Sequence, residues 1–359
     1  MLLKSHQLQQ ILISVVLLVF LSACRIQMNT SYDVWTDQAA VLKDEAPHFK
    51  NSIEWWYFTG HLTELNTDRE YGVEYVFFHI NPKGKKDYMM AHFAVSDPNN
   101  NSFIYDYQFE GLKDNLRADL PLQLRIEKRN RTWQLTGQEG VYHLSAEMVK
   151  PKGFAIDLRT VPSKPVLMHD GNGYFNYEDF GSAGYYSYTR LSTSGILTLN
   201  GVKKNVKGEL WYDRQWNGGN VAQKDMAWDW MAIQFDGSQD ELMIGILYNH
   251  KTGKQFVAGT FFDSNSKNTH LKQADIRIKE LAYWKSKESK AEYPIKWNVK
   301  VPRFGYDLIV EAVIRHQELK LSLAPFHRMF YWEGKCKVYG TRNGQPVTGK
   351  SYAEITNRK

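Results

Sequence analysis

Short apolar or alternating segments, separated by turn residues, follow one another along most of the chain. The run YGVEYVFFHI at 71–80, for example, leads through the turn NPKGKK into YMMAHFAVSD at 88–97. Side chains of a β-strand alternate between its two faces, so runs of this length and spacing are typical of antiparallel strands. Almost no stretch shows the 3.6-residue period of a long amphipathic helix. The pattern therefore predicts an all-β protein.

This pattern of strands occurs twice. The aromatic run EWWYFTGHL at 54–62 is followed by a turn and an apolar strand, and WDWMAIQF at 228–235 is followed in the same way. Between the two halves lies NGGNVAQKD at 217–225, a small and polar segment that suits a linker. We therefore predict two similar antiparallel β-barrel domains in tandem, at 45–218 and at 225–359.

The first residues are typical of an export signal. Lys4 precedes ILISVVLLVFL at 11–21, an apolar run too short to span a bilayer as a mature helix. The run ends in LSAC, which matches the bacterial lipobox, so we predict a signal peptide at 1–23 and a lipid on Cys24. The alternative is an ordinary secretory signal with an incidental cysteine.

A lipid on Cys24 would hold the protein at a membrane surface, with residues 24–44 as the linker to the first barrel. The residue after the cysteine is Arg25 rather than Asp. By the usual sorting rule this favours the outer membrane of a Gram-negative host. The predicted location is the periplasmic side of that membrane.

Charge and cysteine content narrow the range of partners. The formal net charge is +6, and loss of residues 1–23 lowers it by one. Lysine and arginine are interspersed with acids, so no nucleic-acid partner is predicted. The only cysteines are Cys24 and Cys336, and lipidation of the first leaves no intramolecular disulfide. Stability is therefore expected to come from the hydrophobic cores.

The aromatic run at 54–62 has rings on both of its faces. Trp55 and Tyr57 alternate with Trp56 and Phe58, so neither face is a plain solvent face. The rings suit either barrel packing or the wall of a ligand pocket. Glu54 in this setting is either a structural partner of an arginine or an acid with a raised pKa that could donate a proton.

Three histidines lie on the first predicted strands. His79 and His92 share faces with apolar residues of a predicted hairpin, where the two could meet across the strands and, with His61, suggest a metal triad. Their spacing does not match a zinc motif, so no metal site is predicted. Hydrogen bonding of His79 and His92 to a ligand oxygen is the functional alternative.

Six sequence blocks occur in a fixed order over residues 45–357: EWWYFTGHL, GYYSYTRL, GELWYDRQWN, WDWMAIQFDG, YPIKWNVKVP, and YWEGKCKVYGT with SYAEIT. Together they resemble the AttH-like family, which includes the carotenoid 1,2-hydratases (hydroxyneurosporene synthases) and is similar to certain fungal cyclases. The resemblance implies two lipocalin-like β-barrels with an apolar ligand bound within or between them. It also implies a link to envelope ABC-type export systems. Members differ in chemistry, so one activity does not follow.

The block WYDRQW contains the main catalytic candidate. In hydratase members the corresponding segment reads Asp-His-x-Trp, and its aspartate is the favoured acid, which implies that role for Asp213. Trp216 also matches, whereas Arg214 replaces the histidine. An arginine paired with Asp213 would lower the pKa of the aspartate and disfavour proton donation. Neighbours on a strand face opposite sides, so this pairing stays open, as does a purely structural role.

Two functions are compatible with these observations, neither of which requires a cofactor. The first, which we favour from sequence, is a lipid-anchored protein that binds a lipid or isoprenoid in the cell envelope. The second is a hydratase or cyclase acting on a polyene, with Asp213 or Glu54 as general acid and aromatic rings stabilising a cation. No nucleophile elbow, Walker motif or dinucleotide motif supports another class of enzyme. The predicted ligand-binding residues are Trp55, Tyr57, His79, His92, Tyr186, Trp216, Trp228 and Trp230.

Overall fold

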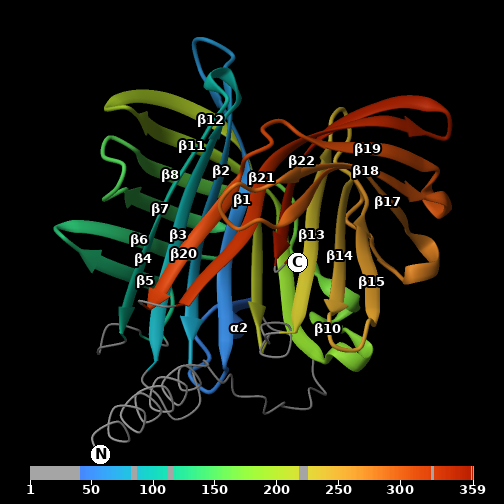
Figure 1. Cartoon of the computed structure of the whole chain (residues 1–359), viewed down its shortest axis with the longest axis horizontal. Coiled ribbons are helices and arrows are strands. Elements are labelled where there is room, and N and C mark those ends of the chain that lie inside the picture. The colour runs from blue at the N-terminus through green and yellow to red at the C-terminus, as the bar shows by residue number, and fades with distance from the viewer. Residues whose placement is uncertain are drawn as a thin grey trace, which may run out of the picture.

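The computed structural model describes residues 41–81, 87–111, 117, 119–217, 225–324, 327–356 and 358. They form two antiparallel sheets that lie side by side, one from each half of the chain (Figure 1). This confirms the all-β, lipocalin-like fold predicted from the sequence. The predicted lipid site Cys24, and residues 218–224 of the predicted linker, lie outside the described residues. None of the described helices is long and apolar enough to cross a membrane.

The first sheet is nearly closed into a barrel. Its strand order is β4-β3-β2-β1-β12-β11-β8-β7-β6-β5, and β4 lies close to β5, so the two edges of the sheet approach each other. Two short strands, β9 and β10, pair with β11 beyond β8. The elements are α2 (Val41–Asp44), β1 (Ile53–Glu64), β2 (Glu70–Ile80), β3 (Tyr88–Asp97), η1 (Pro98–Asn100), β4 (Ser102–Gly111), β5 (Leu122–Lys128), β6 (Arg131–Gln138), β7 (Val141–Glu147), β8 (Ala155–Pro162), β9 (Leu167–Met168), η2 (His169–Gly171), β10 (Tyr174–Asn176), η3 (Glu178–Phe180), β11 (Ser182–Leu199) and β12 (Val202–Trp216).

The second sheet has the order β16-β15-β14-β13-β22-β21-β19-β18-β17, with β20 paired to β21. As in the first sheet, the strands curl around a core of their own, which includes Trp297 and Trp332. The elements are β13 (Met226–Phe235), β14 (Glu241–Asn249), β15 (Gln255–Phe262), β16 (Asn268–Leu271), η5 (Gln273–Asp275), β17 (Arg277–Lys285), β18 (Glu292–Val301), η6 (Pro302–Phe304), β19 (Tyr306–Ala312), β20 (Glu318–Ala324), β21 (His327–Arg342) and β22 (Gln345–Thr356).

The two faces of β1 explain why its sequence is aromatic throughout. Trp56 and Phe58 point into the core of the first barrel, together with the interior rings of β2, β11 and β12. Tyr57 points the other way and packs against Trp230 of the second sheet, with ring centroids 5.5 Å apart. One face therefore belongs to a barrel interior and the other to the junction between the sheets.

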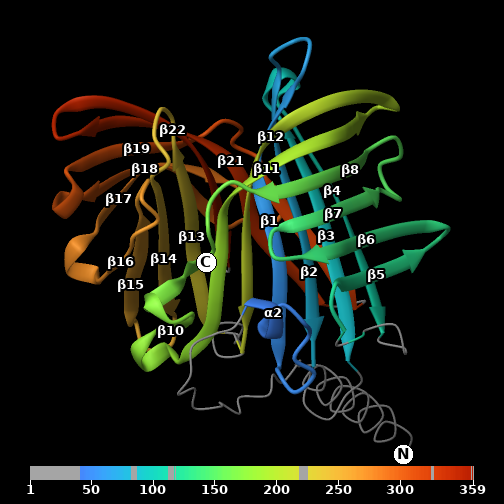
Figure 2. The ribbon, with the colours of Figure 1, turned by 180° about the vertical axis from the view of Figure 1, so that it is seen from behind.

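Elements of each half also reach across to the other. The β20–β21 hairpin extends over the outer face of the first barrel, where Leu319, Leu321 and Tyr331 pack against a cluster that includes Ile80 and Met90 (Figure 1). In the opposite direction, the segment around η2 and β10 lies against β15 and β16 (Figure 2). The junction is therefore held from two sides.

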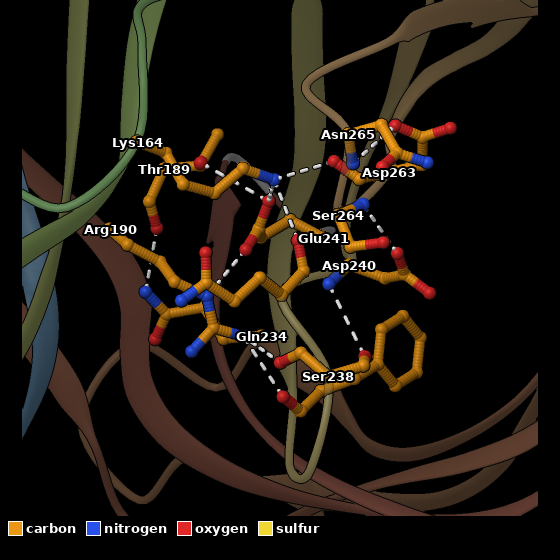
Figure 3. Close-up of polar contacts among 12 residues, drawn as sticks. Lys164, Thr189, Arg190, Gln234, Ser238, Asp240, Glu241, Asp263, Ser264 and Asn265 are labelled. Carbon is orange, nitrogen blue, oxygen red and sulfur yellow. Dashed lines mark hydrogen bonds and ion pairs between the residues drawn. The ribbon is translucent and has the colours of Figure 1, made fainter.

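A buried group of charged residues joins the sheets at a third place (Figure 3). Glu241 of β14 accepts hydrogen bonds from Lys164 Nζ at 2.6 Å and from Arg190 Nε at 2.5 Å, and its side chain is fully buried. Lys164 also donates to the carbonyls of Gln239 and Asp263. Arg190 reaches Glu209 on its own sheet. Both cations belong to the first half of the chain, and the acid that they share belongs to the second.

Gly184→Ala is expected to lower the free energy of unfolding by about 1–3 kcal/mol, the usual effect of overpacking a core. Gly184 is buried on β11 opposite Trp216, and a Cβ there would lie 1.9 Å from the indole ring. Urea unfolding measures the effect. Gly245→Ala is the matched control, because a Cβ at Gly245 meets no atom within 4 Å. Equal stability of both variants would contradict this account.

Candidate functional site

A cavity lies between the two sheets, where their outer faces meet. About 860 Å³ of space is not filled by protein atoms here, a volume that includes open solvent at the mouth of the cavity. Most of its wall is apolar, with rings from both halves of the chain: Trp55, Tyr57, Phe78, Phe175, Tyr177, Tyr185, Trp228, Trp230 and Phe256. Polar groups are few: Asp213, Gln215, Asp229 and Glu354 supply a carboxyl or an amide. This composition suits an apolar ligand held near a small number of acids.

Asp213 is the cavity acid with the most complete set of hydrogen bonds. Oδ1 accepts from Ser187 Oγ at 2.5 Å and from Trp211 Nε1 at 2.6 Å, and Oδ2 accepts from the Tyr185 hydroxyl at 2.6 Å. All three donors are neutral. Burial raises the pKa of Asp213 to about 6, although the three hydrogen bonds oppose the rise. The carboxyl can therefore gain or lose a proton near neutral pH.

Two further acids face the same cavity from the second sheet. Burial raises the pKa of Glu354 on β22 to about 7; a hydrogen bond with Trp228 opposes the rise, and the charge of Asp213 adds to it. Burial also raises the pKa of Asp229 on β13, to about 6, although an ion pair with Arg358 opposes it. Asp229 therefore forms an ion pair with Arg358. Among the described residues, neither Asp213 nor Glu354 forms an ion pair.

Two further carboxylic acids, Glu333 and Glu74, are buried behind the cavity wall, in the junction between the sheets. The Tyr57 hydroxyl donates to Glu333 of β21, and Glu333 is the cross-strand neighbour of Glu354. Glu74 of β2 is fully buried, and neither of its carboxyl oxygens has a hydrogen-bond partner among the described residues. Burial, with the negative charge of Glu354, holds the pKa values of Glu74 and Glu333 well above their usual range. Burial therefore favours the neutral, protonated form of both acids.

Glu54 does not lie in the kind of apolar surroundings that would raise its pKa and make it a proton donor. It faces the inside of the first barrel, where Arg214 Nη2 donates to it at 2.6 Å and His48 and His79 lie at 3.0 and 2.8 Å. Burial alone would raise the pKa of Glu54, but Arg214 and the two histidines hold it well below its usual range. The hypothesis of a raised pKa is wrong for Glu54: it stays ionised and lies away from the cavity.

Arg214 is therefore not a partner of Asp213. It is fully buried on the inner face of β12, where it also donates to the carbonyls of Asp44 and Ala46 and stacks over Trp56. The pairing that would have lowered the pKa of Asp213 is absent, because the two neighbouring side chains face opposite sides of the strand.

Four of the eight predicted ligand-binding residues line the cavity: Trp55, Tyr57, Trp228 and Trp230. The other four do not. Tyr186 and Trp216 lie inside the first barrel, where the Tyr186 hydroxyl donates to Glu45. His79 contacts Glu54 and Asp87, and His92 contacts the Tyr331 hydroxyl at 2.5 Å.

His79 and His92, which the hairpin could have brought together, do not meet. In the β2–β3 register His79 lies opposite Met89 and His92 opposite Val76, so the histidines are offset along the strands. His61 lies elsewhere and contacts Lys335. In the described part of the chain, no group of three potential ligands is arranged to hold a metal ion.

Several cavity residues were not singled out from the sequence. Phe175 and Tyr177 come from the irregular segment before β11, and Glu354 comes from the last strand. Tyr185, rather than its neighbour Tyr186, faces the cavity. The signal for Tyr185 is not local: Tyr185 lies two residues from Ser187, and only the register, which places Ser187 opposite Asp213, shows that this face of β11 is the cavity face.

Fold and cavity together define a two-sheet, lipocalin-like β protein with a largely aromatic cavity between its halves. The family model described as AttH-like matches residues 36–358, so the chain belongs to the AttH-like family. This confirms the resemblance stated from the sequence blocks. A search of curated proteins finds no significant match.

Solved structures show the same fold. An AttH structure from Nitrosomonas europaea is 24% identical, with a TM-score of 0.77, and the alignment covers 91% of this chain and 99% of that one. Kievitone hydratase from Nectria haematococca is 18% identical, with a TM-score of 0.67 and coverage of 92% and 97%. CghA with bound Sch210972 is 10% identical, with a TM-score of 0.54 and coverage of 86% and 89%.

Proposed function

We propose that this protein is a cofactor-free hydro-lyase that adds water to a carbon–carbon double bond of an apolar ligand held between the two sheets. Asp213 carries the proposal: it is a buried acid with a pKa near neutrality, in a cavity otherwise lined by rings and aliphatic side chains. A second observation that supports it is that one solved structure with this fold is named as a hydratase, kievitone hydratase.

The proposed reaction uses Asp213 and Glu354 as a pair. Asp213 gives its proton to one alkene carbon, and the resulting cation lies among aromatic faces that stabilise positive charge. A water molecule forms the new C–O bond, and its surplus proton passes to the carboxylate of Glu354. Because Glu354 has the higher pKa of the two, the reactive form, with the proton on Asp213 and Glu354 ionised, is the minor arrangement of the singly protonated pair. The three hydrogen bonds to Asp213 stabilise its anion once the proton has left.

A carrier of an apolar ligand is the second candidate, supported by the apolar wall of the cavity. The sequence favoured it partly because Arg214 replaces the histidine of the hydratase motif. That argument loses its force, since Arg214 pairs with Glu54 inside the barrel. The lipid anchor at Cys24, the outer-membrane location and the link to an export system stay predictions that are compatible with either candidate.

Labelled water separates the two candidates. The protein is purified from its own host envelope, and its bound ligand is extracted and identified by mass spectrometry. The extracted ligand, or an acyclic carotene in detergent micelles, is then incubated with the protein in ¹⁸O-labelled water. We expect labelled oxygen to appear in the product. Tight binding without any incorporation would support the carrier and contradict the hydro-lyase.

Turnover is expected to be highest between about pH 6 and pH 7 and to fall on both sides. The active pair carries one proton in total, and the reactive fraction is the part of that population in which the proton lies on Asp213 and Glu354 is free to accept one. Below this range both acids are protonated, and above it both are ionised, so each limb should fall by about tenfold per pH unit. Initial rates of ¹⁸O incorporation measure the profile, and a flat profile from pH 5 to 8 would contradict the paired mechanism.

A further inference from the structure

A line of hydrogen bonds leads from Asp213 away from the cavity. Ser187 Oγ lies 2.5 Å from Asp213 Oδ1 and 2.8 Å from His169 Nε2. On the other side of the imidazole, His169 Nδ1 lies 2.9 Å from Thr260 Oγ1. Ser187, His169 and Thr260 are all fully buried. The line crosses from the first sheet to the second, because Thr260 belongs to β15.

The far end of this line lies beside an open groove on the second sheet. Thr260 is the cross-strand partner of His270 on β16. His270 lines the groove with Asp170 and Met168, and its side chain is 24% exposed. The segment around η2, which carries His169, packs against β15 and β16 at this place (Figure 2). The hydrogen bonds therefore run from the cavity to a buried threonine whose cross-strand partner, His270, lines the groove.

The order of these groups differs from that of a hydrolase triad. In such a triad the histidine lies between the serine and the acid and activates the serine as a nucleophile. Here Ser187 lies between His169 and Asp213, and it does not line the cavity. Ser187 is therefore placed to pass a proton rather than to attack a ligand.

The protonation of Asp213 is coupled to the hydrogen position on His169. When Asp213 is ionised, Ser187 donates to it, and His169 Nε2–H donates to Ser187. When Asp213 is protonated and donates to Ser187, Ser187 turns its hydrogen toward His169 Nε2, and the imidazole hydrogen lies on Nδ1. Burial lowers the pKa of His169 to about 3, so the ring stays neutral in both arrangements.

We propose that Ser187, His169 and Thr260 form a proton relay that returns a proton to Asp213 from the groove at His270. The inference rests on the proposed function, in which Asp213 loses one proton per turnover. In each reset Ser187 gives its proton to Asp213, His169 Nε2–H gives one to Ser187, and Thr260 gives one to His169 Nδ1. Thr260, which is buried, regains a proton that enters from the groove past its cross-strand partner His270, and Glu354 releases the proton taken from water. Reorientation of the imidazole then restores the hydrogen of His169 to Nε2 before the next reset, so the cycle closes and the count balances.

Other ionisable groups lie near these hydrogen bonds, and the test must distinguish their titration from that of Asp213. Tyr177, Tyr185 and Glu354 lie near Asp213, and Asp170 and His270 lie near His169. Of these, Glu354 has a pKa of about 7, close to that of Asp213. Glu354→Gln is therefore included in the test so that a signal from Asp213 can be recognised.

The direct test is ¹⁵N nuclear magnetic resonance of histidine-labelled protein, with His169 assigned through His169→Gln. We expect the His169 tautomer to change from Nδ1–H to Nε2–H as the pH rises through about 6. The change should persist in Glu354→Gln and disappear in Asp213→Asn and Ser187→Ala. A tautomer that is independent of pH, or unaffected by Asp213→Asn, would overturn the relay. This readout requires no turnover, so it can fail or succeed independently of the proposed function.

The kinetic test uses the same variants in the ¹⁸O assay. His169→Gln should lower kcat by roughly tenfold or more with KM within about twofold, and added imidazole should restore part of the rate in His169→Gly. His143→Gln, a change at a partly exposed histidine paired with Asp157, is the control and should leave both parameters unchanged. If Asp213→Asn is inactive but His169→Gln retains full kcat at every pH, the relay is wrong and the hydro-lyase stands.

Discussion

Asp213→Asn is expected to reduce turnover by roughly 10²–10⁴-fold, the usual contribution of a positioned acid, while ligand affinity stays within about twofold. The amide has nearly the shape of the acid and fills the same space between Ser187, Tyr185 and Trp211. It cannot give a proton to an alkene, and the proton is needed only in the transition state. Tryptophan fluorescence measures binding, and ¹⁸O incorporation measures turnover.

Asp229→Asn is the matched control, because it makes the same change at another buried acid of the same cavity. Asp229 is held by Arg358 and Tyr248 and transfers no proton in the proposed reaction, so we expect Asp229→Asn to retain most of the turnover. Its pH optimum should shift slightly downward, because the charge of Asp229 adds to the raised pKa of Glu354. Comparable losses of turnover in the two variants would indicate that turnover depends on buried charge in the cavity in general. The assignment of Asp213 as the proton donor would then be wrong. For a carrier, Asp213→Asn would change neither quantity.

The fold could be predicted from the sequence because its signals are local. Strand length, alternation and turn residues are properties of short segments, and they repeat in both halves of the chain. The crossing of the β20–β21 hairpin onto the first barrel could not be predicted in this way. It depends on packing between residues such as Leu319 and Met90, which are far apart in the chain.

The cavity residues were predicted where alternation along one strand sufficed. Tyr57 on β1, and Trp228 and Trp230 on β13, share a face with other cavity residues. Trp216 was placed in the site because it belongs to the family motif, yet it lies three residues from Asp213. An odd spacing puts the two side chains on opposite faces of β12, so strict alternation would have excluded it.

The other features of the site that the sequence did not predict depend on pairs of residues that are distant in the chain. Glu54 and Arg214 are 160 residues apart, and only the register of β1 with β12 shows that they meet inside the barrel. Glu354 lies on the last strand and reaches the cavity because β22 pairs with β13. Neither contact leaves a local signal in the sequence. The environment of an acid, and hence its pKa, therefore required the structure.

Glu241→Gln is expected to lower the free energy of unfolding by about 3–5 kcal/mol, the typical result of removing one partner from a buried ion pair. Glu241 is fully buried between Lys164 and Arg190 (Figure 3). The amide keeps the volume but leaves two buried cations without the acid that they share. Urea unfolding, followed by fluorescence and circular dichroism, measures the loss. Glu127→Gln, at an exposed pair with Arg125, is the control and should leave stability unchanged.

The cause of that loss can be tested by removing one of the cations as well. The double variant Lys164→Met, Glu241→Gln should recover roughly 0.5–3 kcal/mol relative to the sum of the single changes, because the two sites are in contact. Arg190 keeps its ion pair with Glu209 in this background, so no cation is left without a partner acid. Strict additivity would show that Lys164 and Glu241 are not coupled. The charged group at the junction would then stabilise it through packing and carbonyl contacts rather than through shared charge.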